Sequence, residues 1–271
     1  MDSELSCNGY SGWYKNKVVL VTGGTSGIGL EMVRQLVKSG ATVIFCGRDP
    51  LAVDAVSRET GAEGFAVDLA AREKLMPFIA SLRSRFVVDV LINNAGLGNI
   101  MHFHAADIDA LLAMQAVNMD ALVMLSHALL PMITRKPGGG ILNVGSVASF
   151  FPTPGSAVYG ATKYYVAGFT DALHEECLAF GVHVTGVYPG PTSSRFLSRA
   201  TSGKKADWDK AMSPGFVAAA ALSGLVVNKI RVVPGFYNKA LILAARTFSI
   251  DFLLYLLRKR RSQASQKGGV L

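Results

Sequence analysis

A tyrosine and a lysine four residues apart, Tyr159 and Lys163, are the pair in this sequence best suited to acid–base chemistry. They lie in a stretch with helical spacing, so both side chains point to one face, where they can meet. A tyrosine has an ordinary pKa of about 10, and a neighbouring ammonium group favours the phenolate and so lowers that pKa. Without further context, however, most pairs with this spacing lie on solvated helix faces. The rest of the chain therefore decides between these two interpretations.

A glycine-rich turn lies between an apolar run at residues 18–21 and a stretch whose apolar residues have helical spacing. Its sequence is Thr22-Gly23-Gly24-Thr25-Ser26-Gly27-Ile28-Gly29. Glycine lets the backbone turn sharply and approach a phosphate, and the first turn of the following helix offers free N–H groups to the anion. A plain tight turn would have a similar composition. The order strand, glycines, helix and second apolar run favours a pyrophosphate site.

Apolar and β-branched runs alternate with helical stretches along most of the 271 residues. The expected strands are residues 18–21, 41–46, 64–67, 88–92, 140–144 and 182–188, and the longest expected helices are residues 106–132 and 156–180. Such alternation is typical of a parallel sheet covered on both faces. We therefore predict an α/β fold with a single Rossmann-like, doubly wound sheet over residues 16–235, an N-terminal extension over 1–15, and an apolar helix with a basic tail over 236–271.

The composition is that of a globular chain, since 50% of the residues are apolar and 17% are charged. The net charge of +8 is concentrated in the tail, where residues 258–261 and Lys267 carry five positive charges. No nucleic-acid motif accompanies this tail, which disfavours nucleic-acid binding. The three cysteines fit neither a disulfide framework nor a zinc pattern, and the first 17 residues lack the apolar core of a signal peptide. We expect a cytoplasmic protein.

Four motifs occur in order along the chain. They are Thr22-Gly23-x-x-x-Gly27-x-Gly29, Asn93-Asn94-Ala95-Gly96, Tyr159-Gly160-Ala161-Thr162-Lys163 and Pro189-Gly190-Pro191-Thr192. In this combination the sequence resembles the short-chain dehydrogenase/reductase family, from about residue 17 to about residue 192. The resemblance turns the Tyr159 and Lys163 pair from a shared helix face into an expected active site.

The resemblance implies four catalytic residues: Asn118, Ser146, Tyr159 and Lys163. Tyr159 is expected to donate a proton to a carbonyl oxygen that Ser146 positions, while NADPH delivers hydride to the carbon. Lys163 is expected to lower the tyrosine pKa and to hold the nicotinamide ribose, and Asn118 to keep a water in the proton relay. Ser149, a second serine near Tyr159, is interpreted as a pocket or turn residue. Asn118 falls within an apolar helix, where a buried amide needs partners.

The end of the second expected strand bears on the choice of cofactor. Gly47 stands where the family places an NAD-selecting acid, and Arg48 follows it, which favours NADP(H) because arginine binds phosphate through charge-assisted bonds. The alternative is that Arg48 is a solvated loop charge. Asp49, followed by Pro50, is interpreted as a helix N-cap.

The resemblance also implies a wider set of cofactor-binding residues. They are Gly23, Thr25, Ser26, Gly27, Ile28, Gly29, Arg48, Asp68, Leu69, Asn94, Ala95, Gly96, Tyr159, Lys163, Pro189, Gly190 and Thr192. No metal site is predicted, because His102 and His104 have no third ligand at a suitable spacing.

The C-terminal part departs from the family's usual final strand with a Val-Asp-Gly-Gly-like turn. Instead, Val232-Val233-Pro234-Gly235 leads into an apolar stretch and then the basic run 258–261. Polar residues interrupt the stretch and disfavour a membrane-spanning helix, namely Asn238, Lys239, Arg246 and Asp251. Two interpretations fit this stretch. It forms an interfacial helix on anionic lipid, or it forms a helix that packs on the body or on a second subunit of a dimer or tetramer. This end resembles the DltE-like subgroup of the family and membrane-attached hydroxysteroid and acyl reductases.

The resemblance implies an NADPH-dependent oxidoreductase that interconverts a carbonyl and a secondary alcohol. In the family, the segment after Thr192 covers the substrate, and here it combines basic and apolar residues. That composition suits an apolar 3-oxoacyl, steroid-like or other ketone or aldehyde substrate, and a solvated helical lid fits it equally well. The alternative function is a non-catalytic NADP(H)-binding regulatory or scaffold protein, which would not need all four catalytic residues.

Overall fold

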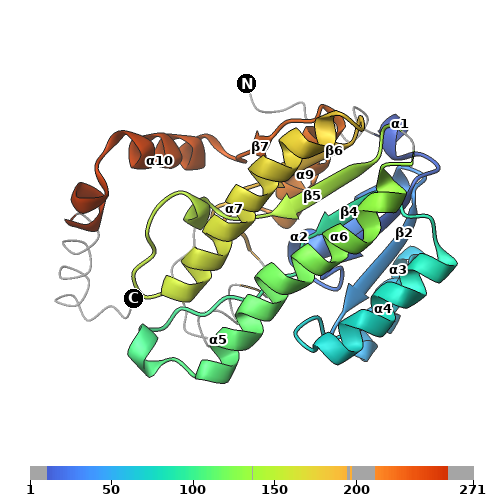
Figure 1. Cartoon of the computed structure of the whole chain (residues 1–271), viewed down its shortest axis with the longest axis horizontal. Helices are drawn as coiled ribbons and strands as arrows, with labels where there is room; N and C mark the ends of the chain where they lie inside the picture. The colour runs from blue at the N-terminus through green and yellow to red at the C-terminus, as the bar shows by residue number, and fades with distance from the viewer. Residues whose placement is uncertain (1–10, 136, 194–195, 197–210, 256–271) are drawn as a thin grey trace.

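The computed structural model describes residues 11–135, 137–193, 196 and 211–255. Its framework is a seven-stranded parallel sheet with the strand order β3-β2-β1-β4-β5-β6-β7 (Figure 1). The strands are β1 (Val18–Thr22), β2 (Thr42–Gly47), β3 (Glu63–Ala66), β4 (Val90–Asn93), β5 (Gly140–Val144), β6 (His183–Val187) and β7 (Arg231–Val232). The order reverses between β1 and β4, so the carboxyl ends of these two strands border the crevice in which such sheets bind ligands.

The predicted fold class is confirmed, and the six expected strands are present within a few residues of their predicted ends. The expectation that a final strand is absent is wrong. Residues Arg231 and Val232 pair in parallel with Gly186 and Val187 at the edge of the sheet. The strand escaped notice because it is two residues long and Pro234, which has no N–H to donate, follows it closely.

Helices cover both faces of the sheet, as a doubly wound fold requires. One face packs against α2 (Gly27–Lys38), α3 (Pro50–Thr60) and α9 (Pro214–Val226), through residues such as Met32, Val56 and Leu222. The other packs against α4 (Arg72–Arg85), α6 (Ala121–Ile133) and α7 (Ala157–Leu178), through residues such as Leu75, Leu129 and Leu173. Central strands are therefore apolar on both sides: Val19 and Val21 of β1 enter the first core, and Leu20 enters the second.

The expected long helix over residues 106–132 is present with an internal change of pitch. It consists of α5 (Ile108–Gln115), a π-helical turn over Ala116–Asp120, and α6. By length and composition the 26-residue run Ile108–Ile133 could cross a membrane. Leu125, Leu129 and Ile133 lie in the core against the sheet, however, which identifies the run as a core helix.

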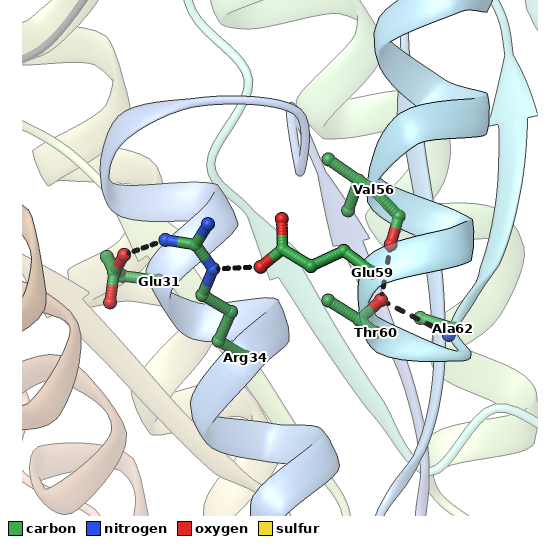
Figure 2. Close-up of polar contacts among 6 residues, drawn as sticks. All are labelled: Glu31, Arg34, Val56, Glu59, Thr60 and Ala62. Carbon is green, nitrogen blue, oxygen red and sulfur yellow. Dashed lines mark hydrogen bonds and ion pairs between the residues drawn. The ribbon is translucent and has the colours of Figure 1, made fainter.

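An ion-pair group ties α2, which follows the glycine-rich turn, to α3. The Arg34 guanidinium lies 2.6 Å from a carboxylate oxygen of Glu31 on its own helix and 2.6 Å from one of Glu59 on α3 (Figure 2). Beside it, the Thr60 hydroxyl donates to the Val56 carbonyl and accepts from the Ala62 N–H, closing the end of α3. Exposed pairs of this kind add little stability, so the apolar core remains the main determinant of where α2 lies.

Candidate active site

The glycine-rich turn has the backbone geometry of a phosphate-binding loop. Gly23 and Gly27 have φ angles of 68° and 57°, a left-handed conformation that favours glycine. At Gly29, an added Cβ would lie 2.3 Å from the Gly23 carbonyl oxygen and 2.3 Å from the Asn94 amide nitrogen. The turn is therefore folded tightly onto the loop after β4, and no larger residue fits at Gly29 without a shift of these groups.

The first turn of α2 is open toward an anion. Ser26 precedes the helix in extended conformation, and its side chain makes no capping hydrogen bond with any residue that the structure describes. The N–H groups around Gly27, Ile28 and Gly29 are thus left for a ligand at the positive end of the helix dipole. These residues fit the pyrophosphate of a dinucleotide, as the sequence predicted.

The end of β2 faces this turn. A Cβ on Gly47 would lie 2.5 Å from Thr25 Cγ2, so an acid at this position could not be accommodated unless Thr25 moved. Arg48 follows and is exposed, which leaves its guanidinium able to reach a phosphate. Asp49 accepts a hydrogen bond from Leu51 N at 3.0 Å and caps α3, as predicted.

Two further predicted cofactor residues follow β3. Asp68 accepts a hydrogen bond from Ala70 N at 3.0 Å and is half-buried. The Leu69 side chain is buried in the core against the second face of the sheet. Leu69 can therefore border a ligand with its backbone, whereas its side chain holds the turn in place.

The Asn-Asn-Ala-Gly segment after β4 supports the glycine-rich turn. The Asn94 amide donates to the Thr22 and Gly23 carbonyls at 2.8 and 3.2 Å. In return, the Thr22 hydroxyl accepts from the N–H groups of Asn94 and Ala95, both at 3.0 Å. A Cβ on Gly96 would lie 3.6 Å from Lys163 Nζ, so the same segment also reaches the expected catalytic lysine.

Lys163 is buried on the inner face of α7, with 5% of its surface exposed. Its ammonium group donates to the Val144 carbonyl at the end of β5, at 3.0 Å. Burial lowers the pKa of Lys163 from 10.5 to about 8. Strongly shifted pKa values of this kind cluster at functional sites.

Tyr159 lies one helical turn before Lys163 and is half-buried. Lys163 Nζ lies 5.8 Å from the centroid of the Tyr159 ring, and the Tyr159 hydroxyl shares a hydrogen bond with Ser146. Burial raises the pKa of the Tyr159 hydroxyl, and the bond to Ser146 opposes this shift. The sequence predicted a lowered pKa for Tyr159, whereas in the structure burial has the larger effect and the pKa is raised.

Ser146 opens a tight turn directly after β5. Its hydroxyl accepts from Ala148 N at 3.2 Å, and Ser149 accepts from Ser146 N at 3.4 Å, a reciprocal capping arrangement. Ser149 is buried, and its hydroxyl donates to the Lys163 carbonyl at 2.7 Å. Sequence reasoning placed Ser149 in a turn but missed this link, which ties the Ser146 turn to the backbone of α7.

Asn118 lies in the π-helical turn and is buried, at 2% exposure. Its amide oxygen accepts from Leu97 N at 2.8 Å, and its amide nitrogen donates to Leu97 O and to the Thr162 hydroxyl, both at 3.0 Å. The predicted need of this buried amide for partners is therefore met. These bonds fix the loop after Gly96 against α7, and a role of Asn118 in holding a relay water stays a prediction.

The third loop at this edge of the sheet follows β6. The Pro189 carbonyl accepts from Val147 N at 3.0 Å, which ties this loop to the Ser146 turn. The Thr192 hydroxyl donates to the Gly190 carbonyl at 3.0 Å, and Thr192 forms an isolated parallel bridge with Met212. The structure thus brings the carboxyl ends of β1, β4, β5 and β6, with all four predicted catalytic residues, to one edge of the sheet.

The part of the chain that carries the glycine-rich turn, the Ser146 turn and the Tyr159 and Lys163 pair matches a known protein family. The sequence model described as "short chain dehydrogenase" matches residues 17–205. The chain belongs to the short-chain dehydrogenase family.

Members of the short-chain dehydrogenase family resemble the chain over most of its length. An uncharacterized oxidoreductase of Staphylococcus saprophyticus is 30% identical over 235 residues, covering 81% of this chain and 98% of that protein. An NADP-dependent 3-hydroxy acid dehydrogenase of Salmonella typhi is 34% identical over 177 residues, covering 64% of this chain and 71% of that protein. A short-chain dehydrogenase of Sphingobium yanoikuyae, solved with NADPH, superposes with a TM-score of 0.76 at 28% identity, covering 90% and 95% of the two chains.

In this short-chain dehydrogenase, a cavity of about 420 Å³ borders α7. Its walls include Ala157, Ala161 and Tyr164 of α7, together with residues 152–154 and Ile250. Positions 157, 161 and 164 recur at helical spacing and lie on the side of α7 opposite Tyr159 and Lys163. The cavity is therefore distinct from the space around the Tyr159 hydroxyl.

Proposed function

We propose that the protein is an NADPH-dependent carbonyl reductase that interconverts a carbonyl and a secondary alcohol by hydride transfer. The observation that carries the proposal is the meeting of Tyr159, Ser146 and Lys163 beside a turn built to bind pyrophosphate. These groups come from α7, from the turn after β5 and from the edge of the sheet at β1, so packing of the sheet determines their relative positions. A protein that only binds a nucleotide needs neither the Tyr159 and Lys163 pair on α7 nor the Ser146 turn after β5.

NADP(H) is the cofactor that this site fits. The close approach at Gly29 and the open first turn of α2 suit a pyrophosphate. Glycine in place of an acid at position 47 leaves a free ribose hydroxyl without its usual ligand. The neighbour from Sphingobium yanoikuyae was solved with NADPH, and the relative from Salmonella typhi is NADP-dependent. Arg48, exposed beside the turn, is the group proposed to bind the 2′-phosphate.

When bound, NADPH supplies the hydride that the carbonyl carbon accepts. The protein's own residues act on the carbonyl oxygen: the Ser146 hydroxyl donates a hydrogen bond that orients it, and Tyr159 donates the proton. A tyrosine hydroxyl is protonated near neutral pH and can therefore act as the acid in this direction. Lys163, held by the Val144 carbonyl, keeps a positive charge near the phenolate that forms.

The proposed substrates are apolar ketones or aldehydes, including 3-oxoacyl and steroid-like compounds. The Phe196 ring centroid lies 6.0 Å from that of Tyr159, so an apolar side chain borders the proton donor. An assay of NADPH oxidation over aldehydes, ketones, quinones, 3-oxoacyl thioesters and steroids tests the proposal. Turnover of at least one class supports the enzyme, whereas tight NADPH binding without turnover of any class supports the non-catalytic alternative.

Replacing Arg48 with serine should raise the Kd of NADPH by about 10- to 100-fold, since the loss of charge-assisted bonds to a phosphate costs about 1.5–3 kcal/mol. The Kd of NADH should change little, because NADH lacks the 2′-phosphate. Fluorescence titration of both nucleotides measures the two constants. The matched control is Arg58→Ser, which removes an exposed arginine from the far end of α3. Equal NADPH affinity in the Arg48 and Arg58 variants would refute the assignment.

A further inference from the structure

The last described part of the chain carries an apolar surface that the other described residues leave exposed. The helix α10 (Phe236–Thr247) follows β7 and extends away from the sheet, and residues 250–255 add further helical turns (Figure 1). Phe236 is 82% exposed and Leu243 is 68% exposed. The other large exposed apolar side chains of this segment are Tyr237, Phe248, Ile250, Phe252 and Tyr255.

The exposed apolar residues of α10 lie on one side of the helix, opposite the side that contacts the body. Phe236, Ala240 and Leu243 recur at helical spacing and are all exposed. On the other side, Asn238 and Ile242 are buried, and the Asn238 amide donates to the Pro234 carbonyl at 2.8 Å. The helix is therefore attached through one face, and the docking face defined by Phe236, Tyr237, Ala240 and Leu243 points away from the protein.

Basic residues border this docking face. Lys239 and Arg246 are exposed and lie on one edge of α10, seven residues apart and so on the same side. Arg246 also lies with its guanidinium 5.4 Å from the Phe150 ring centroid, which links the helix to the loop after the Ser146 turn. Asp251 is the one acidic residue in the sequence from 236 to 271, which continues with the basic run 258–261.

We propose that the docking face binds the surface of an anionic lipid bilayer. Aromatic and aliphatic side chains on one side of a helix, bordered by lysine and arginine, match a helix that lies in the plane of the interface. The charge distinguishes this partner from a second copy of the chain, since two copies meeting at this face would bring the exposed Lys239 and Arg246 side chains of both copies near one another. Anionic headgroups instead neutralise these charges, and each basic residue near the surface adds to the attraction. A cytoplasmic protein docked in this way is peripheral to the membrane.

Flotation of the full-length protein with vesicles tests the proposal. One set of vesicles contains phosphatidylcholine alone, and the other contains equal parts of phosphatidylcholine and phosphatidylglycerol. The wild type should float with the anionic vesicles and release at high salt, because salt screens the attraction. The double variant Phe236→Glu, Leu243→Glu should lose about tenfold or more of this binding, since it places acids in the apolar face.

The matched control is Val227→Glu, which places an acid at another exposed apolar position, 72% exposed and outside the docking face. NADPH affinity and the thermal midpoint, measured for all three proteins, confirm that each is folded. Sedimentation without lipid measures self-association. The proposal is overturned if the wild type does not float with anionic vesicles, if the control loses binding as the double variant does, or if the double variant alters self-association and leaves flotation unchanged.

Discussion

Replacement of Tyr159 with phenylalanine should lower kcat by about 10²- to 10⁴-fold, the usual contribution of a general acid. The variant removes the hydroxyl that shares a hydrogen bond with Ser146 and keeps the ring that lies beside Phe196. The fold and the nucleotide site should therefore persist. The Kd of NADPH should stay within about twofold of the wild-type value, because a group that acts only in the transition state does not contribute to binding of the cofactor in the ground state. Steady-state assays and fluorescence titration measure the two quantities.

Tyr164→Phe is the matched control for this variant. Tyr164 lies five residues further along α7, is 42% exposed, and borders the cavity on the opposite side of the helix. Its hydroxyl has no part in the proposed chemistry, so kcat should stay near the wild-type value. Comparable activity of the Tyr159 and Tyr164 variants would show that another group donates the proton.

Replacement of Lys163 with methionine should lower kcat by about 10²-fold or more, since a buried charge next to the reacting groups is lost. The same change should not destabilise the protein at pH 7. Burial lowers the pKa of Lys163 from 10.5 to about 8, which corresponds to a cost of about 3 kcal/mol for keeping it charged in the fold. Methionine avoids this cost but leaves the Val144 carbonyl without its donor, which costs about 1–3 kcal/mol. We expect a net gain of about 0–2 kcal/mol.

The pH dependence of stability separates these contributions. Because the pKa of Lys163 is lower in the folded state, its cost is full below pH 8 and disappears as the pH rises toward 10.5. Wild-type stability should therefore rise relative to that of Lys163→Met between pH 8 and pH 10. Urea unfolding of both proteins without cofactor at pH 7 and pH 10 measures the difference. A variant that is less stable than the wild type by about 2 kcal/mol at pH 7 would mean that Lys163 is a structural lysine.

The sheet could be predicted from the sequence because its central strands are buried on both faces. Such strands appear as nearly continuous apolar runs, as in Val18–Thr22 and Gly140–Val144, and the helices between them keep one apolar side. The edge strand β7 could not be predicted in this way. Its pairing depends on Gly186 and Val187, more than forty residues earlier, and two residues carry no period of their own.

The candidate site could be predicted where a residue's role depends on local spacing. Tyr159 and Lys163 share a helix turn, and the glycines lie between a strand and a helix. Local spacing does not reveal how deeply a residue is buried or which distant residues it contacts. The bond from Ser149 to the Lys163 carbonyl joins residues fourteen apart, the Asn118 bonds span 21 and 44 residues, and the direction of the Tyr159 pKa shift depends on how deeply the fold buries the ring.

The most direct test of the proposed activity follows the hydrogen that is transferred. NADPH that carries deuterium at both hydrogens of the reactive C4 carbon of its nicotinamide ring is incubated with the protein and with each carbonyl of the substrate panel, and the products are examined by mass spectrometry. We predict that an apolar ketone or aldehyde is converted to an alcohol with one deuterium on the former carbonyl carbon, in the wild type and not in Tyr159→Phe. An alcohol product without the label, or no product from any carbonyl while NADPH binds tightly, would contradict the account.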